Sequence, residues 1–116
     1  MSKKGSTVYP LRLSESGFAI TVRAIQELSL RSGKYETLPG VIARAVTSDR
    51  DINSLIIKQL DGEIIFDGDI KISLRLDNEI RDLFRDYQER LSAIVEQPLT
   101  VRDCAVLISL QLLNEL

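Results

Sequence analysis

The clearest pattern in the chain is the alternation of residues 70–76, which read Ile-Lys-Ile-Ser-Leu-Arg-Leu. Apolar side chains occupy the even positions and polar side chains the odd positions, as is typical of a strand with one buried face. We therefore expect Lys71, Ser73 and Arg75 to face outwards. Residues 7–13 predict a second, weaker strand. Pro10 fits there only if its missing N–H would point away from the partner strand.

Apolar residues at three- and four-residue steps predict two helices after the strand at 70–76. Asp77 is the expected N-cap of the first, over residues 78–96, and Pro98 marks its end. Thr100 is the expected N-cap of the second, over residues 101–114, with Asp103 completing a capping box. This last helix is apolar around most of its circumference, which is typical of a helix buried between other helices.

The same order of elements is predicted after the strand at 7–13. Ser14 caps a helix over residues 15–31, which Gly33 ends, and Thr37 caps a shorter helix. Phe18, Val22 and Ile25 give the longer helix either a broader apolar face or a rotated register relative to residues 78–96. Between the halves, we expect a helix up to about residue 60 and a short strand over 63–66, or alternatively a hairpin across 61–62.

The two halves repeat each other at a fixed offset. Ser14 corresponds to Asp77 (77 − 14 = 63), and Thr37 corresponds to Thr100 at the same offset. A lone strand cannot satisfy its own backbone groups, and the repeat supplies a partner strand. We therefore predict a mainly α fold with a short two-stranded antiparallel ribbon, in which residues 8–13 pair with 71–76 within one chain or between two. The expected divisions are 1–47, a connector over 48–69, and 70–116.

Composition limits the chemistry. The chain has no histidine, and its one cysteine, Cys104, lies in an apolar run that predicts a buried structural thiol rather than a nucleophile. The acidic turns at 61–63 and 67–69 lack the spacing of a calcium-binding loop. No phosphate-cradling glycine motif is present. We therefore expect no metal, no cofactor and no enzymatic activity.

Charge and hydropathy bear on partners and location. No apolar run approaches the length that spans a bilayer, and the start of the chain lacks the apolar stretch of a signal peptide, so we expect a cytoplasmic protein without a membrane partner. The net charge is −2, but residues 1–50 carry eight Lys or Arg and four Asp or Glu, whereas residues 51–116 carry seven and thirteen. Binding in a DNA groove depends on the local electrostatic field, so the net charge alone does not decide whether the chain binds nucleic acid.

The order strand, helix, turn and helix occurs twice in the chain. This arrangement resembles the ribbon-helix-helix superfamily of DNA-binding proteins. The tandem arrangement resembles TraY-type relaxosome accessory proteins of conjugative plasmids, through residues 31–42 and 75–83. In this superfamily, outward residues of the paired strands read base edges in the major groove. The resemblance assigns that role to Lys71, Ser73, Arg75 and Arg12. The first strand has Val8 and Pro10 where the family pattern is polar, so the two strands should contribute unequally to base reading.

The resemblance also implies that backbone N–H groups at the start of each second helix hold DNA phosphates. The corresponding residues are Thr37 and Leu38 with Lys34 nearby, and Thr100 and Val101 with Arg102 beside them. Such helix starts attract anions. Lys3 and Lys4 are either a solvated terminus or a basic arm on phosphates.

The expected function is sequence-specific binding of double-stranded DNA, as a transcriptional repressor or a relaxosome accessory factor. The alternative is a protein-interaction module of the same fold, as in antitoxin-like proteins, with little DNA binding. We also expect self-association, or a protein partner, through an apolar patch on the C-terminal helix. Its members are Val106, Leu107, Leu110 and Leu113. The apolar face of Phe18, Val22 and Ile25 is the second choice for this interface.

Overall fold

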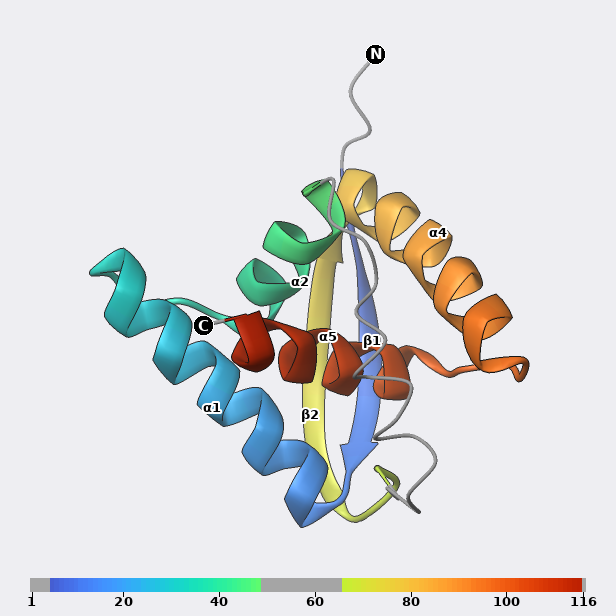
Figure 1. Cartoon of the computed structure of the whole chain (residues 1–116), viewed down its shortest axis with the longest axis horizontal. Helices are drawn as coiled ribbons and strands as arrows, with labels where there is room; N and C mark the ends of the chain where they lie inside the picture. The colour runs from blue at the N-terminus through green and yellow to red at the C-terminus, as the bar shows by residue number, and fades with distance from the viewer. Residues whose placement is uncertain (1–4, 49–65, 116) are drawn as a thin grey trace.

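The computed structural model describes residues 5–48 and 66–115. In these ranges the chain forms two strands and four helices, with the helices covering one face of the ribbon (Figure 1). The elements in chain order are β1 (Ser6–Leu13), α1 (Glu15–Ser32), α2 (Leu38–Thr47), β2 (Ile70–Asp77), α4 (Asn78–Val95) and α5 (Val101–Glu115). The predicted mainly α fold with a two-stranded ribbon is confirmed. None of the described helices is both long and apolar enough to cross a membrane.

The two strands pair antiparallel, as the repeat predicts, and of the two alternatives the structure shows pairing within one chain, with Leu13 opposite Ile70 and Ser6 opposite Asp77. Just beyond the paired residues, the backbone N–H of Asn78 donates to the carbonyl of Gly5 at 3.1 Å. Because hydrogen-bonded pairs alternate along an antiparallel ribbon, Pro10 and Ser73 form a non-hydrogen-bonded pair. The missing N–H of Pro10 therefore costs the ribbon no hydrogen bond.

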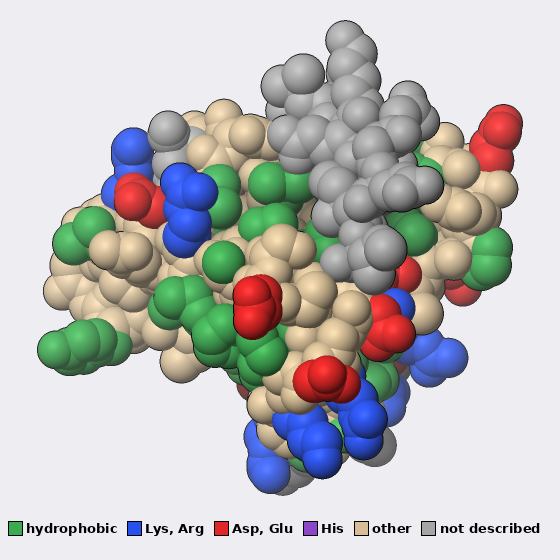
Figure 2. Space-filling model, turned by 90° about the horizontal axis from the view of Figure 1, so that it is seen from below, with side chains coloured by type: hydrophobic (Ala, Val, Ile, Leu, Met, Phe, Trp, Pro, Cys, Tyr) green, Lys and Arg blue, Asp and Glu red, His purple; other side chains and the backbone are tan. Residues whose placement is uncertain are grey.

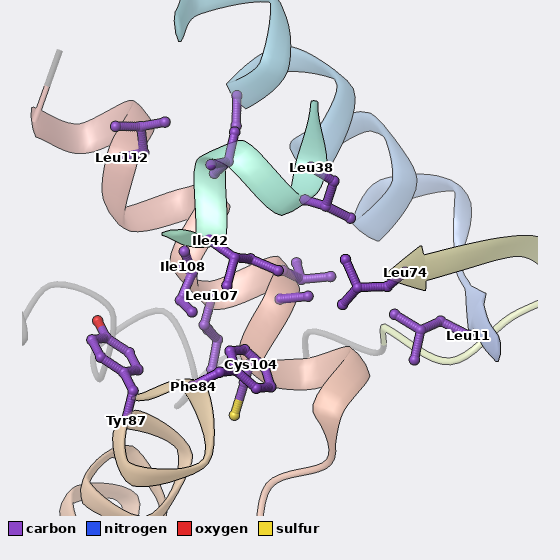
Figure 3. Close-up of a cluster of buried hydrophobic side chains, with 14 of the residues drawn as sticks. Leu11, Leu38, Ile42, Leu74, Phe84, Tyr87, Cys104, Leu107, Ile108 and Leu112 are labelled. Atoms are coloured by element: carbon purple, nitrogen blue, oxygen red, sulfur yellow. The ribbon is translucent and has the colours of Figure 1, made fainter. Parts of the chain in front are cut away.

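The two halves of the chain pack against each other. α1 packs mainly on α5, and α2 packs on α4 and α5. The core is a single cluster that takes residues from both strands and all four described helices. Figure 3 shows part of it, in which Phe84 of α4 and Cys104 and Leu107 of α5 lie close together. Both halves therefore contribute to one hydrophobic core.

The predicted exposure of all four apolar patch residues on the last helix is wrong, whereas self-association or a protein partner through this helix stays a prediction. Val106 and Leu107 are fully buried, and Leu110 and Leu113 are half-buried. The physical reason is that α5 runs across the middle of the helical layer, against α1 and α2 (Figure 1). Neighbouring helices thus cover most of its circumference, which agrees with the burial expected from its composition.

α1 keeps the register of α4 and differs in side-chain size. Its buried positions include Thr21, Ala24 and Leu28, which correspond at the 63-residue offset to Phe84, Tyr87 and Leu91, all buried in α4. Thr21 and Ala24 on α1 are small where α4 has aromatic rings, and α1 packs more extensively on α5 than α4 does. The first helix therefore has a broader apolar face and not a rotated register.

The predicted N-caps at Ser14, Thr37 and Thr100 are confirmed. The Ser14 hydroxyl accepts from the N–H of Gly17 at 3.1 Å. Thr100 and Asp103 form the expected capping box, each side chain accepting from the other's backbone N–H. Asp77 occupies the N-cap position, but its side chain makes no capping hydrogen bond, contrary to expectation. Asp77 is still paired in the ribbon, and its side chain lies on the exposed face.

Helices α1 and α4 end at equivalent positions in a left-handed conformation. Gly33, the predicted terminator, has φ 75°, and Glu96, 63 residues later, has φ 58°. This conformation strains residues with a Cβ. We expect Glu96→Gly to raise the free energy of unfolding by about 0.5–1 kcal/mol and Gly33→Ala to lower it by about 1 kcal/mol. Urea unfolding of both variants checks this, and two changes of the same sign would contradict it.

The predictions for residues 49–65, including the helix up to about residue 60 and the alternative hairpin across 61–62, lie outside the described residues. Phe66 is buried, is not in a strand, and accepts the backbone N–H of Ser14 at 2.6 Å. A Cβ on Gly68 would lie 2.5 Å from the backbone of Leu13 and Ser14. The segment entering β2 is therefore held against the end of β1, and only glycine fits at position 68.

Candidate nucleic-acid interface

The face of the ribbon opposite the helices is exposed along both strands. It carries Val8, Pro10 and Arg12 from β1 and Lys71, Ser73 and Arg75 from β2. Cross-strand pairs place Arg12 opposite Lys71, Pro10 opposite Ser73 and Val8 opposite Arg75. The structure thus brings together all four side chains predicted to contact bases. Figure 2 shows one group of Lys and Arg side chains at the lower edge of the molecule, with Asp and Glu side chains beside it, and further Lys and Arg side chains elsewhere on this face.

Arg12 and Lys71 are two cations placed side by side. Directly opposite residues in an antiparallel pair have Cβ atoms about 4.5–5.5 Å apart, and like charges there destabilise the ribbon. Within the described residues, no ion pair or hydrogen bond involves the side chain of either residue, nor that of Arg75. A polyanion or an acceptor-rich surface would relieve this repulsion.

The start of α2 lies beside the β2 side of the ribbon. A groove there is lined by Pro39 and Gly40 of α2 and by Arg75 and Asp77 of β2, among others. The Gly40 N–H already donates to the Thr37 hydroxyl, and Pro39 has no N–H. The Leu38 N–H has no partner within the helix and can donate to an anion, and no acidic residue lies in the first turn.

The start of α5 lies beside the β1 side, in a groove lined by residues 9–12 of β1 and by Thr100, Val101 and Arg102. Here the N–H groups of Val101 and Arg102 point out of the helix start. The Arg102 guanidinium, however, pairs with Asp67 at 3.2 Å and with Asp103 at 3.3 Å. A phosphate at this site would have to compete with two carboxylates for Arg102.

The remaining phosphate candidates lie elsewhere. Lys34 follows the end of α1 and lines a different hollow, with Leu30 and Tyr35, so it flanks neither groove beside the ribbon. Lys3 and Lys4 lie outside the described residues. Of the predicted phosphate contacts, the structure therefore brings the two helix starts to the ribbon and leaves Lys34 apart from it.

A polar cluster at one end of the ribbon was not predicted from the sequence. The Thr7 hydroxyl donates to Asn78 Oδ1 at 2.9 Å and accepts from the Arg81 guanidinium at 3.1 Å. Arg81 also pairs with Asp82 at 3.1 Å. The two contacts of Thr7 join residues more than 70 positions apart, and no local pattern signals them. They fix the start of β1 to the start of α4 and so hold the ribbon face in place.

The buried titratable groups belong to the core. Burial raises the pKa of the Cys104 thiol to about 12, which keeps it protonated, and the predicted structural role of this residue is confirmed by its full burial. Burial also raises the pKa of Tyr87 to about 12, and its hydroxyl donates to Gln111 Oε1 at 2.5 Å. In the described ranges, no group of three or more Cys, Asp or Glu side chains is placed to hold a metal ion.

Comparison with protein-family models, with curated proteins and with solved structures finds no match to this chain.

Proposed function

We propose that this chain is a tandem ribbon-helix-helix protein that binds duplex DNA sequence-specifically, with its ribbon in the major groove. The proposed role is transcriptional repression or accessory action in plasmid transfer. The exposed face of the ribbon carries this proposal, because three cations and a serine stand on it in register. Arg and Lys donate to guanine O6 and N7, and Ser can donate or accept.

The arrangement of the elements supports the proposed fold class. Strand, helix and helix occur twice in the same order, the two strands form one ribbon, and α1 of the first half packs on α5 of the second. Each half thus supplies a partner strand and a packing partner for the other half. A two-stranded ribbon fits the B-DNA major groove, which is about 12 Å wide.

The local charge supports DNA binding although the chain carries a net charge of −2. On the exposed ribbon face, Arg12, Lys71 and Arg75 outnumber the one carboxylate, Asp77. The starts of α2 and α5 flank the ribbon on its two sides, and helix starts favour anions. Phosphates on both walls of the groove would then meet backbone N–H groups while the ribbon meets the base edges.

Arg75→Ala should weaken binding to the preferred duplex by about 1–3 kcal/mol and relax the preference at one base position, because it removes a base-edge contact. Arg102→Ala should instead weaken binding to all duplexes alike, since it leaves Asp67 and Asp103 uncompensated beside the groove. Duplexes selected from a random pool at about 150 mM salt, followed by titration of each variant, provide the measurement. Equal affinity of the wild type and Arg75→Ala would contradict the proposal.

A protein-interaction module is the second candidate, and the outer surface of α1 favours it. Phe18 and Val22 are 37% and 43% exposed, and the end of α1 adds Leu30 at 70%. Large exposed apolar side chains of this kind mark protein interfaces when they form one patch. If the wild type and Arg75→Ala bind duplex DNA equally, this surface becomes the better candidate for function.

A further inference from the structure

The exposed face of the ribbon has an approximate two-fold symmetry about the pair of Pro10 and Ser73. At the 63-residue offset of the repeat, Val8 corresponds to Lys71, Pro10 to Ser73, and Arg12 to Arg75. One end of the face therefore carries Arg12 beside Lys71, and the other end carries Arg75 beside Val8. Arginine is retained at both ends, and the residue beside it changes from lysine to valine.

Val8 is well placed to touch a ligand on this face. Its side chain is 46% exposed, although it lies between two half-buried residues of β1. Val8 and Arg75 form a non-hydrogen-bonded pair, by the same alternation that applies to Pro10 and Ser73, and side chains lie closest in such pairs. Two groups about 5 Å apart can reach neighbouring base pairs, which are about 3.4 Å apart along the helix.

The two ends of the ribbon face differ in chemistry, and different base pairs suit each end. Lysine donates hydrogen bonds to the acceptors of guanine, whereas an aliphatic side chain in the major groove contacts the C5-methyl group of thymine. We propose that Val8 makes the DNA target asymmetric by contacting a thymine methyl group beside the guanine that Arg75 reads. In the other half-site, Lys71 reads an acceptor edge beside the guanine of Arg12. This inference rests on the proposed DNA-binding function.

The experiment uses the full chain and duplexes selected from a random pool by the wild type and by Val8→Lys, at one stated salt concentration. The wild type should select two related half-sites that differ at one base pair, with thymine in the half-site of Arg75. Replacing that thymine with deoxyuracil removes only the methyl group. It should weaken wild-type binding about fourfold, the equivalent of one buried methyl group.

Val8→Lys makes the two ends of the ribbon alike, so it should select a palindrome and lose its sensitivity to deoxyuracil. Ile94→Lys is the matched control, because Ile94 is a similarly exposed β-branched residue on α4, and it should select the wild-type site. Thermal unfolding of each variant verifies that the fold is retained.

The outcomes separate this inference from the proposed function. If the wild type selects no sequence, the DNA-binding function itself fails. If it selects a palindrome, or if deoxyuracil has no effect at any position of the selected site, DNA binding stands and the role of Val8 is overturned. If the effect of deoxyuracil persists in Val8→Lys, another residue contacts the methyl group, and the assignment to Val8 is again overturned.

Discussion

Truncating Phe84 to alanine is expected to lower the free energy of unfolding by about 3–5 kcal/mol, the range for deleting a fully buried ring. Phe84 is 0% exposed and lies among core residues contributed by both halves of the chain. A loss of this size is a large part of the stability of a small domain. Because the core is shared, circular dichroism during urea unfolding should report a single transition at lower denaturant.

Leu83→Ala is the matched control, since Leu83 is the neighbouring residue on α4 and is 43% exposed. Its effect should be about 1 kcal/mol or less. Two separate unfolding transitions in the wild type, or equal losses for the two variants, would show that the halves do not share one core around Phe84.

Replacing both Arg12 and Lys71 with alanine is expected to weaken DNA binding without lowering the stability of the fold. Their side chains are directly opposite and have no acidic partner among the described residues, so removing them should leave the fold as stable or stabilise it by up to about 1 kcal/mol. Affinity for the selected duplex should fall at least about 30-fold, because each lost base contact costs about 1–3 kcal/mol.

Arg23→Ala with Arg31→Ala is the control for this double variant. Both arginines are exposed on α1, and the change in net charge is the same. Thermal unfolding and duplex titration of both double variants provide the comparison. If the α1 variant loses as much affinity as the ribbon variant, net charge and not the ribbon governs binding. If the ribbon variant is destabilised, the cations have a structural role that their position does not suggest.

The parts of the fold that were predictable from sequence are those set by local patterns. The alternation at 70–76 identifies β2, and Ser14, Thr37 and Thr100 mark helix starts because their side chains replace missing backbone partners. The pairing of the strands follows from the repeat. The outward positions of Arg12 and Arg75 follow from the two-residue period of each strand.

The errors concern contacts between segments far apart in the chain. The apolar composition of α5 indicates burial, but only the packing of α1 and α2 against it shows that Val106 and Leu107 are covered. Likewise, the pairing of Arg102 with Asp67 joins residues 35 positions apart. Asp77 makes no capping hydrogen bond, and it is paired with Ser6 of the other strand, with its side chain on the exposed face. Local sequence carries no signal for such competition between partners.

Methylation interference at guanine N7 tests most directly whether the ribbon enters the major groove, because N7 is exposed only there. In the selected duplex, methylating one guanine in each half-site should block binding of the wild type. For Arg75→Ala, interference should disappear in one half-site and persist in the other, where Arg12 reads the guanine. Binding that tolerates methylation at every guanine N7 would contradict the account.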